Sequence, residues 1–145
     1  MKRLLSVALI SLLAAGCAQT SKTAQADKPA VLDKAAAEKA AIAKAAAANV
    51  AADPTLIPFE KMSAKLTPVT EAQLLAILPT VKAGKTVLVR GHCYRKDIGN
   101  AKAAAQARAV AVKNFLVESG VPAHKIAMRY DTERSLHAVR IEVNG

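Results

Sequence analysis

The sequence predicts an α+β fold in which helices cover one face of a mixed sheet. Apolar runs rich in β-branched residues alternate with helical periodicity across residues 54–145, in the order β-α-β-α-β-β. The strand–helix–strand succession implies a right-handed crossover, so the sheet is expected to be mixed. Aromatic residues make up only 3% of the chain and Trp is absent. We therefore expect an aliphatic core between the sheet and its helices.

The chain opens with the pattern of a secretory signal. Met1–Arg3 is basic, and Leu4–Ala14 is almost entirely apolar. That stretch is too short for a membrane-spanning helix, which needs roughly 20 residues. The string Leu-Ala-Ala-Gly-Cys at residues 13–17 resembles the lipobox of bacterial lipoproteins. The resemblance implies a signal peptide at residues 1–16, cleavage before Cys17, and acylation of Cys17 with chains such as palmitate. The alternative is an ordinary secretory signal that happens to precede a Cys.

Acylation also predicts where the mature protein lies. Stable anchoring takes two or more acyl chains, because each buried methylene contributes only about 0.8 kcal/mol. Ala18 follows the Cys, and in enteric lipoproteins a residue other than Asp at that position usually accompanies transfer to the outer membrane. We therefore expect the protein to be lipid-anchored in the outer membrane, with its folded domain in the periplasm.

Two segments separate Cys17 from this domain. Residues 17–28 are mostly polar and show no apolar period, which predicts a flexible tether. Residues 29–53 are rich in Ala, with Pro29 suited to a first helical position and Pro54 stopping the run, so they predict a helix about 36 Å long. Its large apolar residues are sparse and form a thin seam. The helix is therefore a spacer or pairs weakly with another helix, and we favour the spacer.

The domain itself is expected at residues 54–145. A helix begins at Thr70 with an acidic first turn and ends before Gly84, and the β-branched run that follows reads as a central strand. A second helix carries apolar residues at spacings of four, three and four, and Gly120 ends it. The expected strands are 56–59, 86–90, 126–130 and 138–143, and the expected helices are 70–83 and 100–118.

The net charge is strongly basic, at +10. In the periplasm the nearest polyanions are anionic lipid head groups and the carboxylates of peptidoglycan stem peptides. No RNA-binding signature or interleaved aromatic stripe is present. Nucleic acid is therefore excluded as a partner.

Cys93 becomes the only thiol once Cys17 is acylated, so no intramolecular disulfide can form. It directly follows the apolar central strand. Burial is the expected state, with a bridge to another chain as the alternative.

Four short sequences within residues 91–143 resemble motifs of the OmpA-like peptidoglycan-binding domain. Gly91-His92 closes the central strand, as in the family's Gly-His-Thr-Asp motif. The other three strings are Arg-Ala-x-x-Val at residues 108–112, the turn at 119–126 and the last strand at 139–143. The resemblance covers residues 59–143. It implies binding of peptidoglycan through the diaminopimelate of its stem peptide, held by the motif's Asp and the helix Arg.

Residue by residue, Arg108 matches the helix Arg of the family. The motif's Thr-Asp falls on Cys93-Tyr94, so Tyr94 stands where the family has its carboxylate, and Asp97 is the nearest replacement. The loop 91–100 also joins the end of a strand to the start of a helix, where backbone N–H groups favour an anion. We therefore expect Arg108 and Asp97 to bind peptidoglycan, with a surface salt bridge as the alternative role for Arg108.

Catalysis and metal binding are not expected. His92 and Cys93 are adjacent on a strand and point to opposite faces. The three histidines show no metal-ligand spacing, and nothing in the chain calls for a cofactor. The leading hypothesis is a non-enzymatic anchor that links the outer membrane to peptidoglycan. The alternative is a structural subunit of an envelope-spanning secretion or conjugation complex, with a degenerate OmpA-like domain that does not bind peptidoglycan and contacts other envelope proteins.

Overall fold

A computed structural model of the chain describes residues 28–145, and their side chains from residue 34 onward. The expected signal peptide, Cys17 and the expected tether up to residue 27 lie outside the described residues. The elements follow one another as α1 (Lys28–Ala52), β1 (Leu56–Pro58), α2 (Pro68–Ala83), β2 (Thr86–His92), α3 (Ala101–Glu118), a short 3-10 helix η1 (Ala123–Lys125), β3 (Ile126–Asp131) and β4 (Ala138–Asn144). The predicted α+β class and the order of strands and helices are confirmed.

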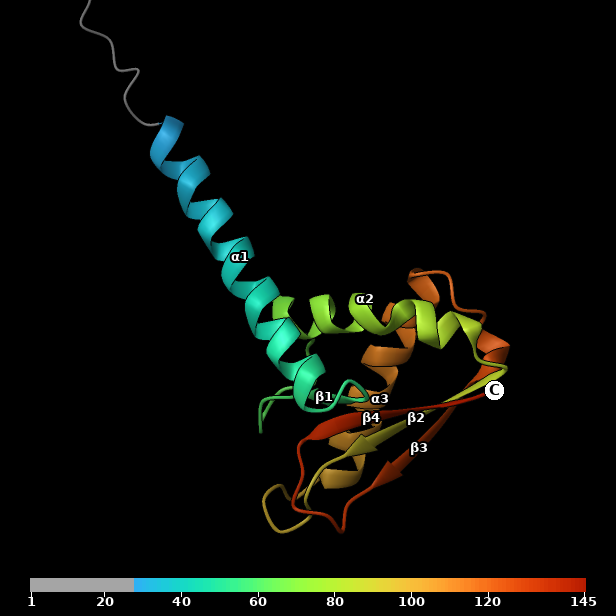
Figure 1. Cartoon of the computed structure of the whole chain (residues 1–145). Helices are drawn as coiled ribbons and strands as arrows, with labels where there is room; N and C mark the ends of the chain where they lie inside the picture. The colour runs from blue at the N-terminus through green and yellow to red at the C-terminus, as the bar shows by residue number, and fades with distance from the viewer. Residues whose placement is uncertain (1–27) are drawn as a thin grey trace, which may run out of the picture.

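The four strands form one mixed sheet in the spatial order β1-β4-β2-β3. The central strand β2 runs parallel to β3 and antiparallel to β4, and β4 pairs with the short β1. Figure 1 shows α2 and α3 on the same side of this sheet, and no helix among residues 28–145 covers its other face. The predicted one-sided arrangement is therefore present.

The Ala-rich helix α1 is partly packed and partly projecting. Its C-terminal half contacts α2, where Ala46 is only 5% exposed and Ile42 and Val50 are half-buried. The N-terminal half extends away from the sheet, as Figure 1 shows. The apolar side of α1 thus pairs with a helix of the same chain, and its role as a spacer stays a prediction. No helix among the described residues has both the length and the apolar character needed to cross a bilayer.

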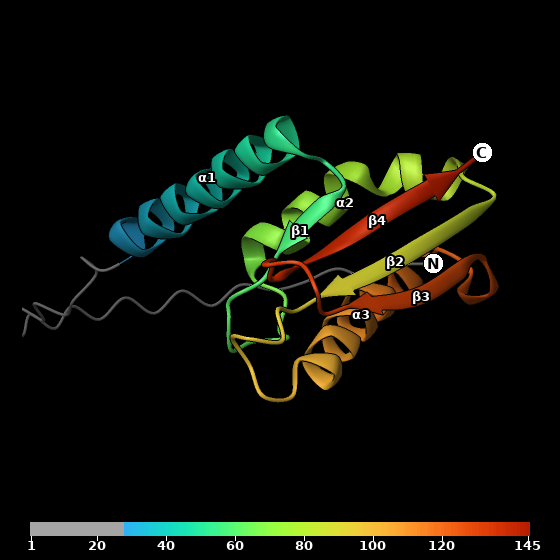
Figure 2. The same ribbon diagram turned by 90° about the horizontal axis from the view of Figure 1, so that it is seen from below.

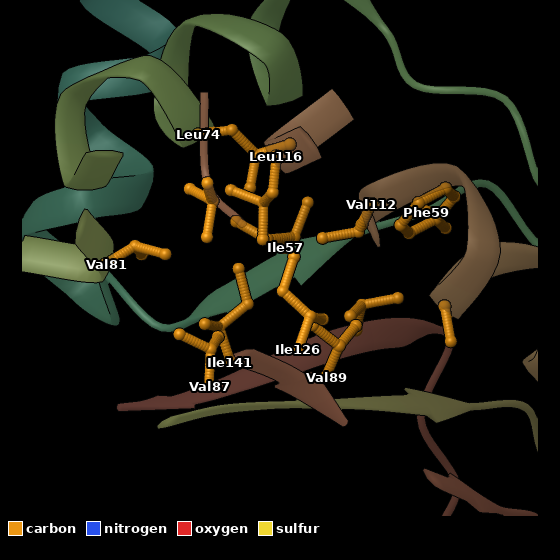
Figure 3. Close-up of a cluster of buried hydrophobic side chains, with 13 residues drawn as sticks. Ile57, Phe59, Leu74, Val81, Val87, Val89, Val112, Leu116, Ile126 and Ile141 are labelled. Carbon is orange, nitrogen blue, oxygen red and sulfur yellow. The ribbon is translucent and has the colours of Figure 1, made fainter. Parts of the chain in front are cut away.

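The core lies between the inner face of the sheet and helices α2 and α3. Side chains of the sheet, such as Val87, Val89 and Ile141, point toward Leu74 of α2 and Leu116 of α3 (Figure 3). Among the described residues, Phe59, at 9% exposed, is the one aromatic member of this buried cluster, so the expected aliphatic core is present.

Local capping explains where the two packed helices begin and end. Thr67 is the N-cap of α2, exchanging hydrogen bonds with Thr70 in a capping box, and Pro68 occupies the first helical turn. The helix therefore starts two residues before the expected Thr70. After α3, Gly120 adopts a φ of +92°, and the Val121 N–H donates to the Leu116 carbonyl oxygen at 2.9 Å. This turn brings the chain back into β3.

Candidate functional site

The candidate site lies at the carboxyl end of β2. Three segments meet there: the loop 93–100 that leads into α3, the loop 60–63 that follows β1, and the residues just before β4. The Phe59 N–H donates to the His137 carbonyl oxygen at 2.9 Å, which joins the second and third of these segments. Asn100 caps α3 by accepting the N–H of Ala103 at 3.4 Å. The site is therefore built mainly from loops that the sheet holds together.

Arg108 is the central side chain of this site, and it is buried, with 1% exposed. Its guanidinium donates to four backbone carbonyl oxygens: Nε to Ser63 at 3.0 Å, Nη1 to His92 at 2.9 Å, and Nη2 to Glu60 at 2.9 Å and Lys61 at 2.8 Å. Nη1 also lies 3.4 Å from Nδ1 of His137. All five donors of the guanidinium have partners within the chain. Arg108 thus binds the 60–63 loop to the end of β2.

His137 connects Arg108 to Asp97. Its Nδ1 faces Arg108, and its Nε2 lies 3.0 Å from Oδ2 of Asp97. An arginine donates hydrogen bonds and accepts none, so Nδ1 must be the acceptor and Nε2–H the donor. Lys61 approaches the other oxygen of Asp97, with Nζ 3.4 Å from Oδ1. A line of contacts therefore runs from the buried guanidinium to a carboxylate at the surface.

Asp97 keeps its charge in this setting. The hydrogen bond from His137 is the main reason that the pKa of the Asp97 carboxyl lies below its usual value; burial opposes it, and Lys61 lowers the pKa further. The carboxylate is about one-third exposed. It can therefore accept hydrogen bonds from a cationic ligand at neutral pH.

A shallow groove lies beside these residues, between the loop 61–64 and the first two turns of α3. Its walls are mainly apolar, with small Ala side chains on α3 and the highly exposed Met62 on the loop. Arg108 and Lys61 border it. The residues that line it are Lys61, Met62, Ser63, Ala64, Ile98, Asn100, Ala103, Ala104, Ala107 and Arg108.

His92 and Cys93 are both buried at the carboxyl end of β2. Both ring nitrogens of His92 lack a hydrogen-bond partner, and Nδ1 is 3.6 Å from Oδ2 of Asp131. Burial lowers the pKa of His92, and the attraction of Asp131 only partly opposes this. Cys93 is fully buried, as expected from its position after the strand, and forms no disulfide within residues 28–145. His92 is therefore neutral at neutral pH.

The two predicted site residues lie near each other, although they do not touch. His137 bridges them, and sequence reasoning missed it, together with Lys61 and the carbonyl oxygens of the 60–63 loop. No spacing in the sequence marked His137, which lies 29 residues from Arg108 and 40 residues from Asp97. Within residues 28–145, no three His, Cys, Asp or Glu side chains are grouped so as to hold a metal ion.

A search of curated proteins finds no match. A family profile described as the OmpA family matches residues 58–138, which is more than half of the chain and includes β2, β3, both packed helices and the site just described. The chain therefore belongs to the OmpA family.

Proposed function

We propose that this protein is a lipid-anchored envelope protein that links the outer membrane to peptidoglycan. Membership of the OmpA family supports the envelope and peptidoglycan part, because domains of this family are generally structural binding domains rather than enzymes. The lipobox-like string that ends at Cys17 supports the anchor. The basic net charge of +10 suits a polymer that carries carboxylates.

The line of contacts from Arg108 through His137 to Asp97 is the observation that carries this proposal. Diaminopimelate carries both an ammonium and a carboxylate at its free end, so it needs an acceptor and a positive charge close together. Asp97 is the acceptor. Arg108 borders the groove and supplies the positive charge. To donate a hydrogen bond directly to the ligand, Arg108 must give up its bond to one of the loop carbonyl oxygens.

Co-sedimentation with isolated peptidoglycan tests the binding role. We expect residues 18–145 to sediment with diaminopimelate-type peptidoglycan, and Asp97→Asn to reduce the bound fraction by about tenfold, because a charged hydrogen bond contributes roughly 1.5–3 kcal/mol. Free diaminopimelate should compete, whereas lysine, which lacks the second carboxylate, should not. Glu71→Gln, an exposed carboxylate on α2, is the matched control. Absence of sedimentation by the unsubstituted chain contradicts the proposal.

A second candidate function rests on the hydrogen bonds that Arg108 already makes within the chain. All five hydrogen-bond donors of Arg108 already have partners in the chain, so this side chain can have a purely structural role. The domain would then belong to a subunit of an envelope-spanning secretion or conjugation complex. Crosslinking in intact cells separates the two. Recovery of a defined complex, with no effect of Asp97→Asn on sedimentation, favours the subunit; recovery of monomer alone excludes it.

The anchor is tested separately from the domain. Labelled palmitate should enter the unsubstituted protein and not Cys17→Ser. The Cys17→Ser variant should also leave the membrane fraction. If it fractionates with membranes as the parent does, the lipid anchor is wrong even where peptidoglycan binding holds.

A further inference from the structure

The two edge strands of the sheet differ in how readily they can pair with a further strand. One edge ends in β1, three residues long and containing Pro58, which cannot donate a ladder hydrogen bond. The other ends in β3, whose six residues pair with β2 in unbroken register and include no proline. Among residues 28–145, no strand pairs with the outer side of β3, and Figure 2 shows it as the outermost strand. Such an edge offers its backbone N–H and C=O groups to a further strand.

An apolar groove runs along the inward side of this edge, between β3 and α3. Met128 and Tyr130 alternate on β3 and are 43% and 45% exposed, and Val110 of α3 is 41% exposed. All three line the groove, together with Gln106, Ala109 and Arg129. Lys102 closes one end, with Nζ 5.2 Å from the centroid of the Tyr130 ring. A strand added to β3 places every second side chain beside these apolar residues.

A row of arginines crosses the opposite face of the sheet. The register sets Arg140 of β4 beside Arg90 of β2, and Arg90 beside Arg129 of β3. Like charges in this arrangement destabilise a sheet. Arg140 is offset by Asp53 at 3.2 Å and Arg90 by Glu142 at 3.5 Å. Arg129 is exposed and has no ion pair within the described part of the chain.

A strand added to β3 would continue this row. The residue opposite Arg129 would have its Cβ about 5 Å away, on the open face of the sheet. A carboxylate there would neutralise the last arginine of the row. The alternate positions of the same strand would face the apolar groove.

We propose that β3 is the docking site for an extended segment of a protein partner in which apolar and acidic residues alternate. The segment adds to the sheet as a fifth strand, its apolar side chains in the groove of Val110, Met128 and Tyr130 and its acidic side chains beside Arg129. The net charge of +10 on the chain favours an acidic partner over a second copy of the same chain. The site shares no lining residue with the groove at loop 61–64, so it does not depend on peptidoglycan binding.

Labelled octapeptides test the chemistry of this site on the full chain in neutral detergent. One peptide alternates Val with Glu and a second alternates Val with Lys. Two further versions of the Val/Glu peptide carry backbone N-methyl groups at every second residue. One version is methylated at the odd-numbered residues and the other at the even-numbered residues. We expect fluorescence anisotropy to show about tenfold tighter binding of the Val/Glu peptide than of the Val/Lys peptide. At least one N-methylated copy should lose binding, because it cannot pair with the backbone. Residues 126–131 should gain protection from hydrogen exchange.

Charge reversal supplies the decisive variants. Arg129→Glu should reverse the preference between the Glu and Lys peptides, whereas Lys39→Glu, on the exposed side of α1, should leave it unchanged. Neither variant should alter sedimentation with peptidoglycan. Three outcomes overturn the proposal: equal binding of the unmodified and both N-methylated peptides, protection of residues 126–131 that rises with protein concentration in the absence of peptide, or Arg129-dependent binding to phosphatidylglycerol vesicles without peptide binding.

Discussion

At the scale of single residues, Arg108 shows how one buried guanidinium can hold several loops of a domain together. A buried charge destabilises a fold unless its hydrogen bonds are satisfied, and here four carbonyl oxygens and one imidazole satisfy every donor. Two of those oxygens belong to adjacent residues, Glu60 and Lys61, and only a planar fork reaches both along with Ser63. The guanidinium thus fixes the shape of one wall of the groove.

Arg108→Lys keeps the charge and removes the fork, so it separates the two roles. We expect a loss of about 3 kcal/mol in the free energy of unfolding, because several buried carbonyl oxygens lose their donors. Urea unfolding of residues 18–145 measures it. Arg134→Ala is the control, since the Arg134 side chain is 66% exposed and its contact with Asp131 should contribute less than about 1 kcal/mol. A change as small as that of the control would mean that water replaces the guanidinium without loss.

His92 makes stability depend on pH. Because burial lowers its pKa in the folded protein below the ordinary value of 6.5, the unfolded chain takes up the proton first as the pH falls. The contribution of neutral His92 is complete above about pH 6.5 and decreases as the pH falls from there toward the lower pKa of the folded state. His92→Leu should flatten the decline in unfolding free energy between pH 7 and pH 5. The exposed His124→Leu should not; equal slopes in all three proteins would contradict the assignment.

At the scale of elements, the site depends on how closely α3 lies over β2. Gly91 makes this approach possible, because a Cβ at that position would lie 2.0 Å from the carbonyl oxygen of Ala105. A backbone atom of a helix cannot move aside as a flexible side chain can. The glycine that closes the central strand therefore sets the distance at which Arg108 meets the carbonyl oxygen of His92.

Gly91→Ala should accordingly destabilise the domain by about 2–3 kcal/mol, since α3 must shift away from the sheet. Gly99→Ala is the matched control, because no atom lies within 4 Å of a Cβ there, and it should change stability by less than about 0.5 kcal/mol. Thermal and urea unfolding measure both. The shift should also weaken protection from hydrogen exchange at the end of β2. Equal stability of the two variants would show that α3 does not pack closely against β2.

At the scale of the whole molecule, what the sequence could predict was local and what it missed was long-range. The β-branched run of β2 and the periodicity of α3 fixed class, order and approximate limits of the elements. The family resemblance pointed to Arg108, and Asp97 was chosen as the carboxylate nearest to the motif position. His137 was missed, because it meets Arg108 and Asp97 only after β4 folds back beside β2, and its sequence separations of 29 and 40 residues leave no periodic signal.

The helix α1 connects the proposed anchor to the domain, and its length can be changed without disturbing the core. Residues 34–40 are exposed and lie before the part of the helix that packs on α2, so deleting these seven residues removes about 10 Å of length without removing a core contact. We expect the unfolding free energy to change by less than about 0.5 kcal/mol and sedimentation with peptidoglycan to stay the same.

In cells, however, the deletion should reduce chemical crosslinking of the protein to the wall at least about twofold, because binding of a tethered domain weakens sharply when its linker no longer spans the gap. Seven Gly and Ser residues inserted ahead of α1 should restore it by returning the lost length. If crosslinking is unchanged by the deletion, α1 is not a spacer between membrane and wall, and its packing on α2 is its structural role.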